Sequence, residues 1–159
     1  MKIKNGPRKT LIIDDARIIF RNFSGAQSKF NREGERNFAL VIDNKESADI
    51  LIKDGWNVKV KPPRDEDDTP LMYLPVKVKF NERGPKVYLN SGDRFIELVH
   101  SDDPEEDMVR NLDTIDIASV DMDIRPFDWE VNGKTGRTAY LEKIHVIQEI
   151  DRFKARYED

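Results

Sequence analysis

The sequence predicts a mainly β fold with minor α content: a single domain over residues 1–159, with one or two short helices and a long C-terminal β-hairpin. Three observations predict this class. Short runs of alternating apolar and polar residues recur along the chain, turns rich in glycine and proline separate them, and an Asn-Gly pair divides the last third into two long arms. The length suits one hydrophobic core. We expect the ends, residues 1–10 and 151–159, to fray.

Composition excludes several classes of protein. Hydrophobic residues make up 38% of the chain and charged residues 36%, which is enough apolar material to argue against global disorder. The chain has no cysteine, so disulfides and thiolate chemistry are excluded. The apolar run at residues 11–13 is too short for a signal peptide or a membrane span. We therefore expect a soluble, cytoplasmic protein with no membrane partner.

Charge is distributed unevenly about a net value of −4. Residues 1–36 carry nine basic and four acidic residues, whereas residues 97–123 carry ten acidic residues and one basic residue. If the two segments lie apart in the fold, the protein has one positive and one negative face.

The first predicted strand covers residues 16–23, and a basic, glycine-containing loop follows it at residues 24–36. Alternation along the strand points Ala16, Ile18 and Phe20 into the core. The opposite row mixes cations with apolar groups: Arg17, Ile19, Arg21 and Phe23.

A second strand, at residues 37–42, leads into a helix. Asp43 is expected to cap the helix because Glu46 stands three residues later, as a capping box requires, and Gly55 is placed to end it. In the strand that follows, at residues 56–61, alternation points Trp56, Val58 and Val60 inward and Lys59 and Lys61 outward.

Residues 62–70 are rich in proline and acidic groups, which predicts a surface loop. Two short strands are predicted at residues 86–90 and 95–99. Asp103 and Pro104 then begin a short helix that runs to about residue 112. Between the loop and these elements, the strand at residues 73–80 turns a basic row outward, composed of Tyr73, Pro75, Lys77 and Lys79.

The last third predicts a hairpin with arms at residues 115–131 and 137–150, joined through Asn132 and Gly133. One face of the first arm is apolar. The other face becomes aromatic and basic toward the turn, and its members are Asp121, Asp123, Arg125, Phe127 and Trp129.

Enzymatic chemistry finds little support. The chain has no Gly-x-Ser-x-Gly elbow and no glycine-rich phosphate loop, and His100 and His145 lack histidine partners at metal-ligand spacing. We expect no catalytic residues, no metal and no cofactor, and we interpret both histidines as structural. The enzyme alternative is a metal-dependent nuclease that uses Asp121 and Asp123, which share a strand face.

Binding of single-stranded nucleic acid requires cations for the phosphates and exposed rings on which bases stack. Several predicted strands offer both on one side while keeping a separate apolar side for the core. Core packing is the alternative interpretation of each ring. The candidate binding residues are Arg17, Arg21, Phe23, Lys59, Lys61, Tyr73, Lys77, Lys79, Arg125, Phe127 and Trp129.

A resemblance supports this interpretation. Residues 16–25, 36–38, 54–59, 63–68 and 124–136 resemble a family of small bacteriophage OB-fold proteins that bind single-stranded DNA. The resemblance implies an OB-like barrel, single-stranded DNA as the partner, a role in phage replication or recombination, and the cytoplasm of the host cell as the location. It also implies contacts with replication or recombination proteins and allows an oligomer. The predicted helix comes earlier in the chain than the usual OB helix, which lies between the third and fourth strands.

The resemblance carries site roles to Arg17, Arg21, Phe23, Trp56, Lys59, Phe127 and Trp129, although alternation alone places Trp56 in the core. A different class of function remains open. The acidic segment 97–123 also suits a protein-interaction module of a phage replication or host-takeover complex.

Overall fold

The computed structural model describes residues 1–150, and the predicted C-terminal fraying at 151–159 lies outside them. Strands dominate the described chain, so the predicted mainly β class is confirmed. In chain order the elements are β1 (Lys2–Asn5), η1 (Pro7–Lys9), β2 (Leu11–Ala16), β3 (Ile18–Asn22), β4 (Arg36–Val41), α1 (Lys45–Lys53), β5 (Lys59–Lys61), β6 (Leu71–Val78), β7 (Lys86–Ser91), β8 (Arg94–Glu97), η2 (Val109–Asp113), β9 (Ile117–Val131) and β10 (Lys134–Gln148).

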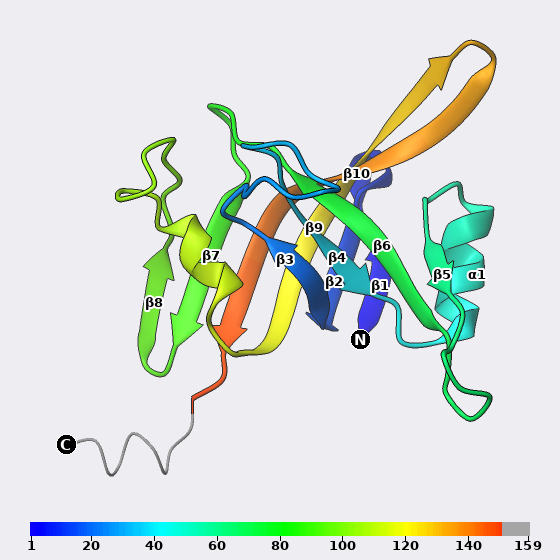
Figure 1. Ribbon diagram of the computed structural model, residues 1–159, viewed down its shortest axis with the longest axis horizontal. Helices are drawn as coiled ribbons and strands as arrows, with labels where there is room; N and C mark the ends of the chain where they lie inside the picture. The colour runs from blue at the N-terminus through cyan, green and yellow to red at the C-terminus, as the bar shows by residue number, and fades with distance from the viewer. Residues whose placement is uncertain (151–159) are drawn as a thin grey trace.

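One curled sheet contains these strands (Figure 1). Its main path runs β1-β2-β9-β10-β6-β4-β3, with β5 paired to β6, and with β7 paired to β10 and β8. β2 and β3 follow one another in the chain and are separated only by Arg17. β2 is near one end of the path and β3 is at the other, so the sheet curls until its two ends meet at this point of the chain. The sheet is therefore an OB-like barrel in which the hydrogen-bonded ladder is not closed.

The interior of the curl is apolar because alternate residues of each strand point inward. Leu11 of β2 lies opposite Ile124 of β9, which in turn lies opposite Leu141 of β10, and all three are at most 3% exposed. Val76 of β6 and Leu40 of β4 complete this layer and are fully buried. On β6 the residues opposite the predicted outward row, Leu74, Val76 and Val78, are buried, and so are Val120, Met122 and Ile124 on the face of the hairpin predicted to be apolar, which confirms both predictions.

A bulge in β3 overturns one predicted row. The pairing of β3 with β4 shifts register between Ile19 and Asn22, and Phe20 takes a left-handed backbone conformation with φ of 52°. A bulge places one extra residue on one side, so every later side chain changes face. Phe20 is consequently exposed, whereas Phe23 is completely buried and stacks on Phe38 with ring centroids 5.2 Å apart. The predicted outward orientation of Phe23 is wrong.

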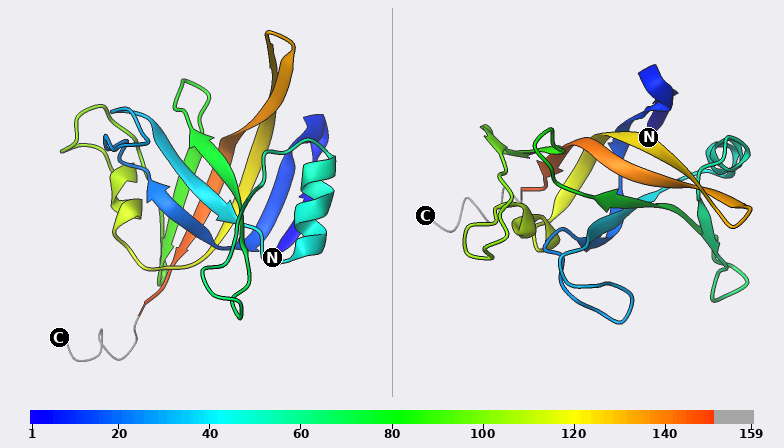
Figure 2. Two further views of the ribbon diagram at one scale, coloured as in Figure 1. Left: turned by 45° about the vertical axis from the view of Figure 1, so that its right-hand side comes forward. Right: turned by 90° about the horizontal axis from the view of Figure 1, so that it is seen from above.

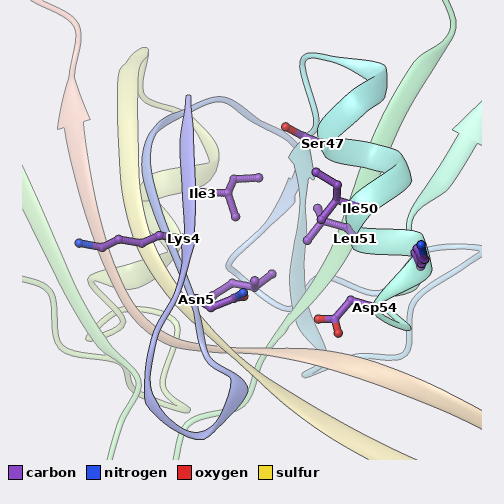
Figure 3. A pocket seen from close by; sticks show the side chains of 9 residues that line it. Ile3, Lys4, Asn5, Ser47, Ile50, Leu51 and Asp54 are labelled. Atoms are coloured by element: carbon purple, nitrogen blue, oxygen red, sulfur yellow. The ribbon is translucent and has the colours of Figure 1, made fainter.

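Helix α1 begins one residue later than predicted. Asn44 caps it, because the Asn44 side chain accepts a hydrogen bond from the backbone N–H of Ser47 at 2.7 Å. Gly55 follows its end with φ of +104°, a conformation that favours glycine, as predicted. Figure 3 shows Ile3 of β1 and Ile50 of α1 pointing toward one another across a shallow pocket.

The start of the short strand β5 differs from expectation, and so does the N-terminus of the chain. Trp56 is buried, as alternation predicts, but the following residues form strand only from Lys59 onward. Val60 lies opposite Met72, on the inner side of β6, but it is 53% exposed, so its predicted place in the core is wrong. At the N-terminus, residues 2–5 pair with β2 as strand β1, where the sequence predicted fraying.

Two carboxylates of the acidic segment bind the basic segment. The helix predicted at residues 103–112 of the acidic segment is instead the short 3-10 helix η2 at Val109–Asp113, which packs beside β3. Asp107 is buried and pairs with Arg36 at 2.9 Å, and Asp113 accepts hydrogen bonds from the backbone N–H groups of Phe23 and Ser24. The basic and acidic segments therefore pack against each other.

Within residues 1–150, no helix is long and apolar enough to cross a membrane.

Candidate nucleic-acid interface

A row of polar and aromatic side chains crosses four strands on the outside of the barrel. Asn37 of β4 lies opposite Lys77 of β6, Lys77 lies opposite Tyr140 of β10, and Tyr140 lies opposite Arg125 of β9. Directly opposed residues in a sheet point to the same face. Because the neighbours Val76 and Val78 on β6 are buried, this shared face is the outer one.

Aromatic rings continue the row along the hairpin. The guanidinium of Arg125 lies 4.9 Å from the ring centre of Tyr140, and Phe127 packs edge-on against the same ring at 6.1 Å. Phe127 remains 52% exposed. Trp129 lies opposite Gly136, and a Cβ at position 136 would overlap its ring, so the glycine provides the space for the indole. The predicted face of Arg125, Phe127 and Trp129 is thus aromatic, basic and accessible.

An arginine braces this hairpin against the end of α1. The Arg137 guanidinium donates to Asp128 Oδ1 at 2.6 Å and to the backbone oxygen of Asp54 at 2.8 Å, and it lies 5.0 Å from the ring centre of Trp56. The hydrogen bond from Arg137 holds the pKa of the Asp128 carboxyl below its usual value of 3.8. These contacts fix the base of a hairpin whose tip projects beyond the barrel (Figure 2).

Further side chains lie on the same outer face where β6 pairs with β5. Lys59 lies opposite Tyr73, and Lys61 lies opposite Leu71, so both lysines share the face of Lys77. Phe20 packs edge-on against Tyr73 with ring centres 5.4 Å apart and is 58% exposed. Sequence reasoning missed Phe20 because simple alternation placed it in the core. It also missed Tyr140, which no predicted grouping contained.

The basic loop at residues 24–35 borders the same face. Within this loop, the side chain of Asn31 accepts a hydrogen bond from the side chain of Asn37, a member of the row, at 2.6 Å. Phe30 is 91% exposed and lies beside Lys29, whose ammonium is 5.8 Å from the ring centre. OB folds bind oligonucleotides on the face of their second and third strands, between two flanking loops. Here β4 and β6 occupy those positions, with the loop at 24–35 and the β9–β10 turn as the flanks (Figure 1).

Most of the predicted binding residues lie on this surface, but three do not. Arg21 points inward at the end of the barrel and donates to the backbone oxygens of Leu112 and Ile115, both at 2.7 Å. Phe23 is in the core. Arg17 is exposed at the break between β2 and β3, where it lines a different groove with Asp15 and Asp43. The residues on the outer face are Lys59, Lys61, Tyr73, Lys77, Lys79, Arg125, Phe127 and Trp129.

The two histidines occupy different surroundings. His145 of β10 packs with Tyr88 and Phe95 in a cluster over β7 and β8, further along the outer face of β10 than Tyr140, and Phe95 is 60% exposed. His100 is exposed and stacks on Phe80. Neither contact involves another histidine.

The barrel and its outer face define an OB-like domain with an aromatic, basic surface where such folds bind oligonucleotides. The whole chain, residues 1–159, matches the model of a family described as "Putative phage ssDNA-binding domain". The chain belongs to this family, which confirms the resemblance seen in the sequence.

The fold is similar to that of solved structures of a phage protein. The chain is similar to the C-terminally truncated single-stranded DNA-binding protein of bacteriophage Enc34, with 15% identity, a TM-score of 0.57, and coverage of 95% of this chain and 94% of that one. It is also similar to that protein in complex with ssDNA, with 15% identity, a TM-score of 0.54 and 96% coverage of both chains. No curated protein sequence matches significantly.

Proposed function

We propose that this protein binds single-stranded DNA with little sequence preference, along the outer face of β4, β6, β10 and β9. The row of Asn37, Lys77, Tyr140 and Arg125 carries the proposal, because it combines cations that can bind phosphates with a ring on which a base can stack, side by side across four strands. Lys59, Lys61 and Lys79 extend the phosphate contacts, and the further stacking rings are Phe20, Tyr73, Phe127 and Trp129.

Physical reasons favour a single strand over a duplex. A base offers its flat face to a ring only when it is unpaired and unstacked from its neighbours. Aromatic rings and lysine ammonium groups read no pattern of donors and acceptors on base edges, which makes the contact tolerant of sequence. The net charge of −4 is compatible with this binding because four cations, Lys59, Lys61, Lys77 and Arg125, share one face of the sheet.

The family and its relatives support the same ligand. The family is described as a phage ssDNA-binding domain, and one similar structure is a phage protein in complex with ssDNA. By this proposal the protein coats transiently exposed DNA during phage replication or recombination, in the cytoplasm of the host cell, and performs no catalytic step. A protein-interaction role for residues 97–123 is less favoured, because Asp107 and Asp113 of that segment bind the protein's own chain.

Titration of the full chain against fluorescein-labelled oligo-dT, followed by anisotropy at several salt concentrations, tests the proposal. We expect tight binding at low salt that weakens with a slope of about −0.7 in log K against log salt for each phosphate contacted. A hairpin duplex of equal length should bind much more weakly. Absence of binding to oligo-dT at low salt, or equal affinity for the duplex, would refute the proposal.

A further inference from the structure

Three planar groups stack at the edge of the proposed binding face. The guanidinium of Arg36 lies 5.2 Å from the ring centre of Phe80, and the imidazole of His100 lies 4.1 Å from the same ring centre, tilted by only 7°. Phe80 is half-buried and His100 is exposed. The stack therefore runs from the interior outward and has a heteroaromatic ring at its outer end.

The inner end of this stack is held firmly. Arg36 donates to Asp107 Oδ2 at 2.9 Å, to the backbone oxygen of Phe23 at 2.8 Å and to that of Ser101 at 3.1 Å. The side chains of Arg36 and Asp107 are 10% and 2% exposed. A buried guanidinium with three acceptors has little freedom to move, so it fixes the plane of Phe80 and, through it, the plane of His100.

The stack borders a groove of about 500 Å³ that also touches the proposed DNA-binding row. Lys77, Tyr140 and His100 all line the groove. Glu35, Lys79 and Asp102 also line it, so charges of both signs border the groove. The feature that distinguishes the position of His100 is its exposed flat ring, which suits the face of a base.

We propose that His100 is the outer ring of a preorganised stacking site for one nucleobase of the bound strand. Phe80 covers one face of the imidazole, and the base covers the exposed part of the other. A platform that is already ordered loses little conformational freedom on binding. The site rests on the proposed function and adds a residue that lies outside the four-strand row, in the segment between β8 and η2.

Oligo-dT titrations of four chains test this site: the wild type, His100→Ala, His100→Phe and, as a matched control, Val99→Ala. Val99 is the 58% exposed neighbour of His100. We expect His100→Ala to weaken binding roughly five- to thirtyfold, within the range measured when a stacking ring is removed. His100→Phe should stay within about twofold of the wild type, because it keeps a stacking face. Val99→Ala should behave as the wild type, and urea unfolding should give all four chains similar midpoints.

The possible results separate the two proposals. If the wild type does not bind oligo-dT, the proposed function fails. If the wild type binds and His100→Ala binds as well as Val99→Ala, the stacking site is refuted while the function stands. If His100→Phe is as weak as His100→Ala, the ring does not act by stacking, and the site is likewise refuted. His100→Trp tests the contact by fluorescence. The fluorescence that this variant has in excess of the wild type, which already contains two tryptophans, should be quenched by oligo-dT. An excess that is unchanged at saturation would contradict the proposal.

Discussion

Replacement of Phe127 by alanine tests the stacking surface at its most accessible point. The Phe127 ring is 52% exposed and packs edge-on against Tyr140 on the outer face, so its removal should leave the core intact. Stacking of one base on an aromatic side chain contributes about 1–3 kcal/mol. Because the hairpin tip projects from the barrel, we expect the lower part of that range, about 1–2 kcal/mol, which is a five- to thirtyfold loss of affinity.

Phe95→Ala provides the matched control for this experiment. Phe95 is 60% exposed, similar to Phe127, but it packs with Tyr88 and His145 and lies on β8, which is outside the four strands that carry the row of Asn37, Lys77, Tyr140 and Arg125. Anisotropy titration with labelled oligo-dT at one fixed low salt concentration should show a loss for Phe127→Ala and wild-type affinity for Phe95→Ala. Equal effects of the two substitutions would refute the assignment of the binding face.

Three further predictions concern charge, the core and pH. Lys77→Ala should reduce the salt slope of oligo-dT binding by about 0.7, the value of one phosphate contact; an unchanged slope would remove Lys77 from the interface. Phe23→Ala should lower the free energy of unfolding by about 3–5 kcal/mol in urea titrations, because it empties a fully buried site beside Phe38, and a near-neutral effect would contradict that burial. The Asp128–Arg137 pair lowers the pKa of Asp128 in the folded state, so its contribution to stability is present above pH 3.8 and disappears as the pH falls through the lower folded value. The difference in melting temperature between the wild type and Asp128→Asn should therefore shrink below pH 3.8, and a difference that stays constant down to pH 2 would oppose this linkage.

The acidic segment has a structural role, because two of its carboxylates hold the basic segment in place. Asp113 holds the start of the loop at residues 24–35 through two backbone N–H groups, and Asp107 holds Arg36 at its end. The acids that give the chain its negative net charge thus help to position the loop that borders the proposed DNA path.

Local features of the sequence determined the parts of the fold that depend on a few neighbouring residues. The Asn132-Gly133 turn is right because both residues adopt the positive φ values that this pair favours, 51° and 80°. The row of Arg125, Phe127 and Trp129 is right because β9 runs regularly opposite β10 over that stretch. Alternation predicts the direction of a side chain wherever the strand has no bulge.

Only the tertiary structure decided the rest. A single bulge at Phe20 exchanged the faces of Phe20 and Phe23, and nothing in the alternation of residues 16–23 signals it. The alignment of Asn37, Lys77, Tyr140 and Arg125 depends on the register among four strands that lie far apart in the chain. Register of that kind is set by how the buried rows pack together inside the barrel, which is a property of the whole core and not of any one segment.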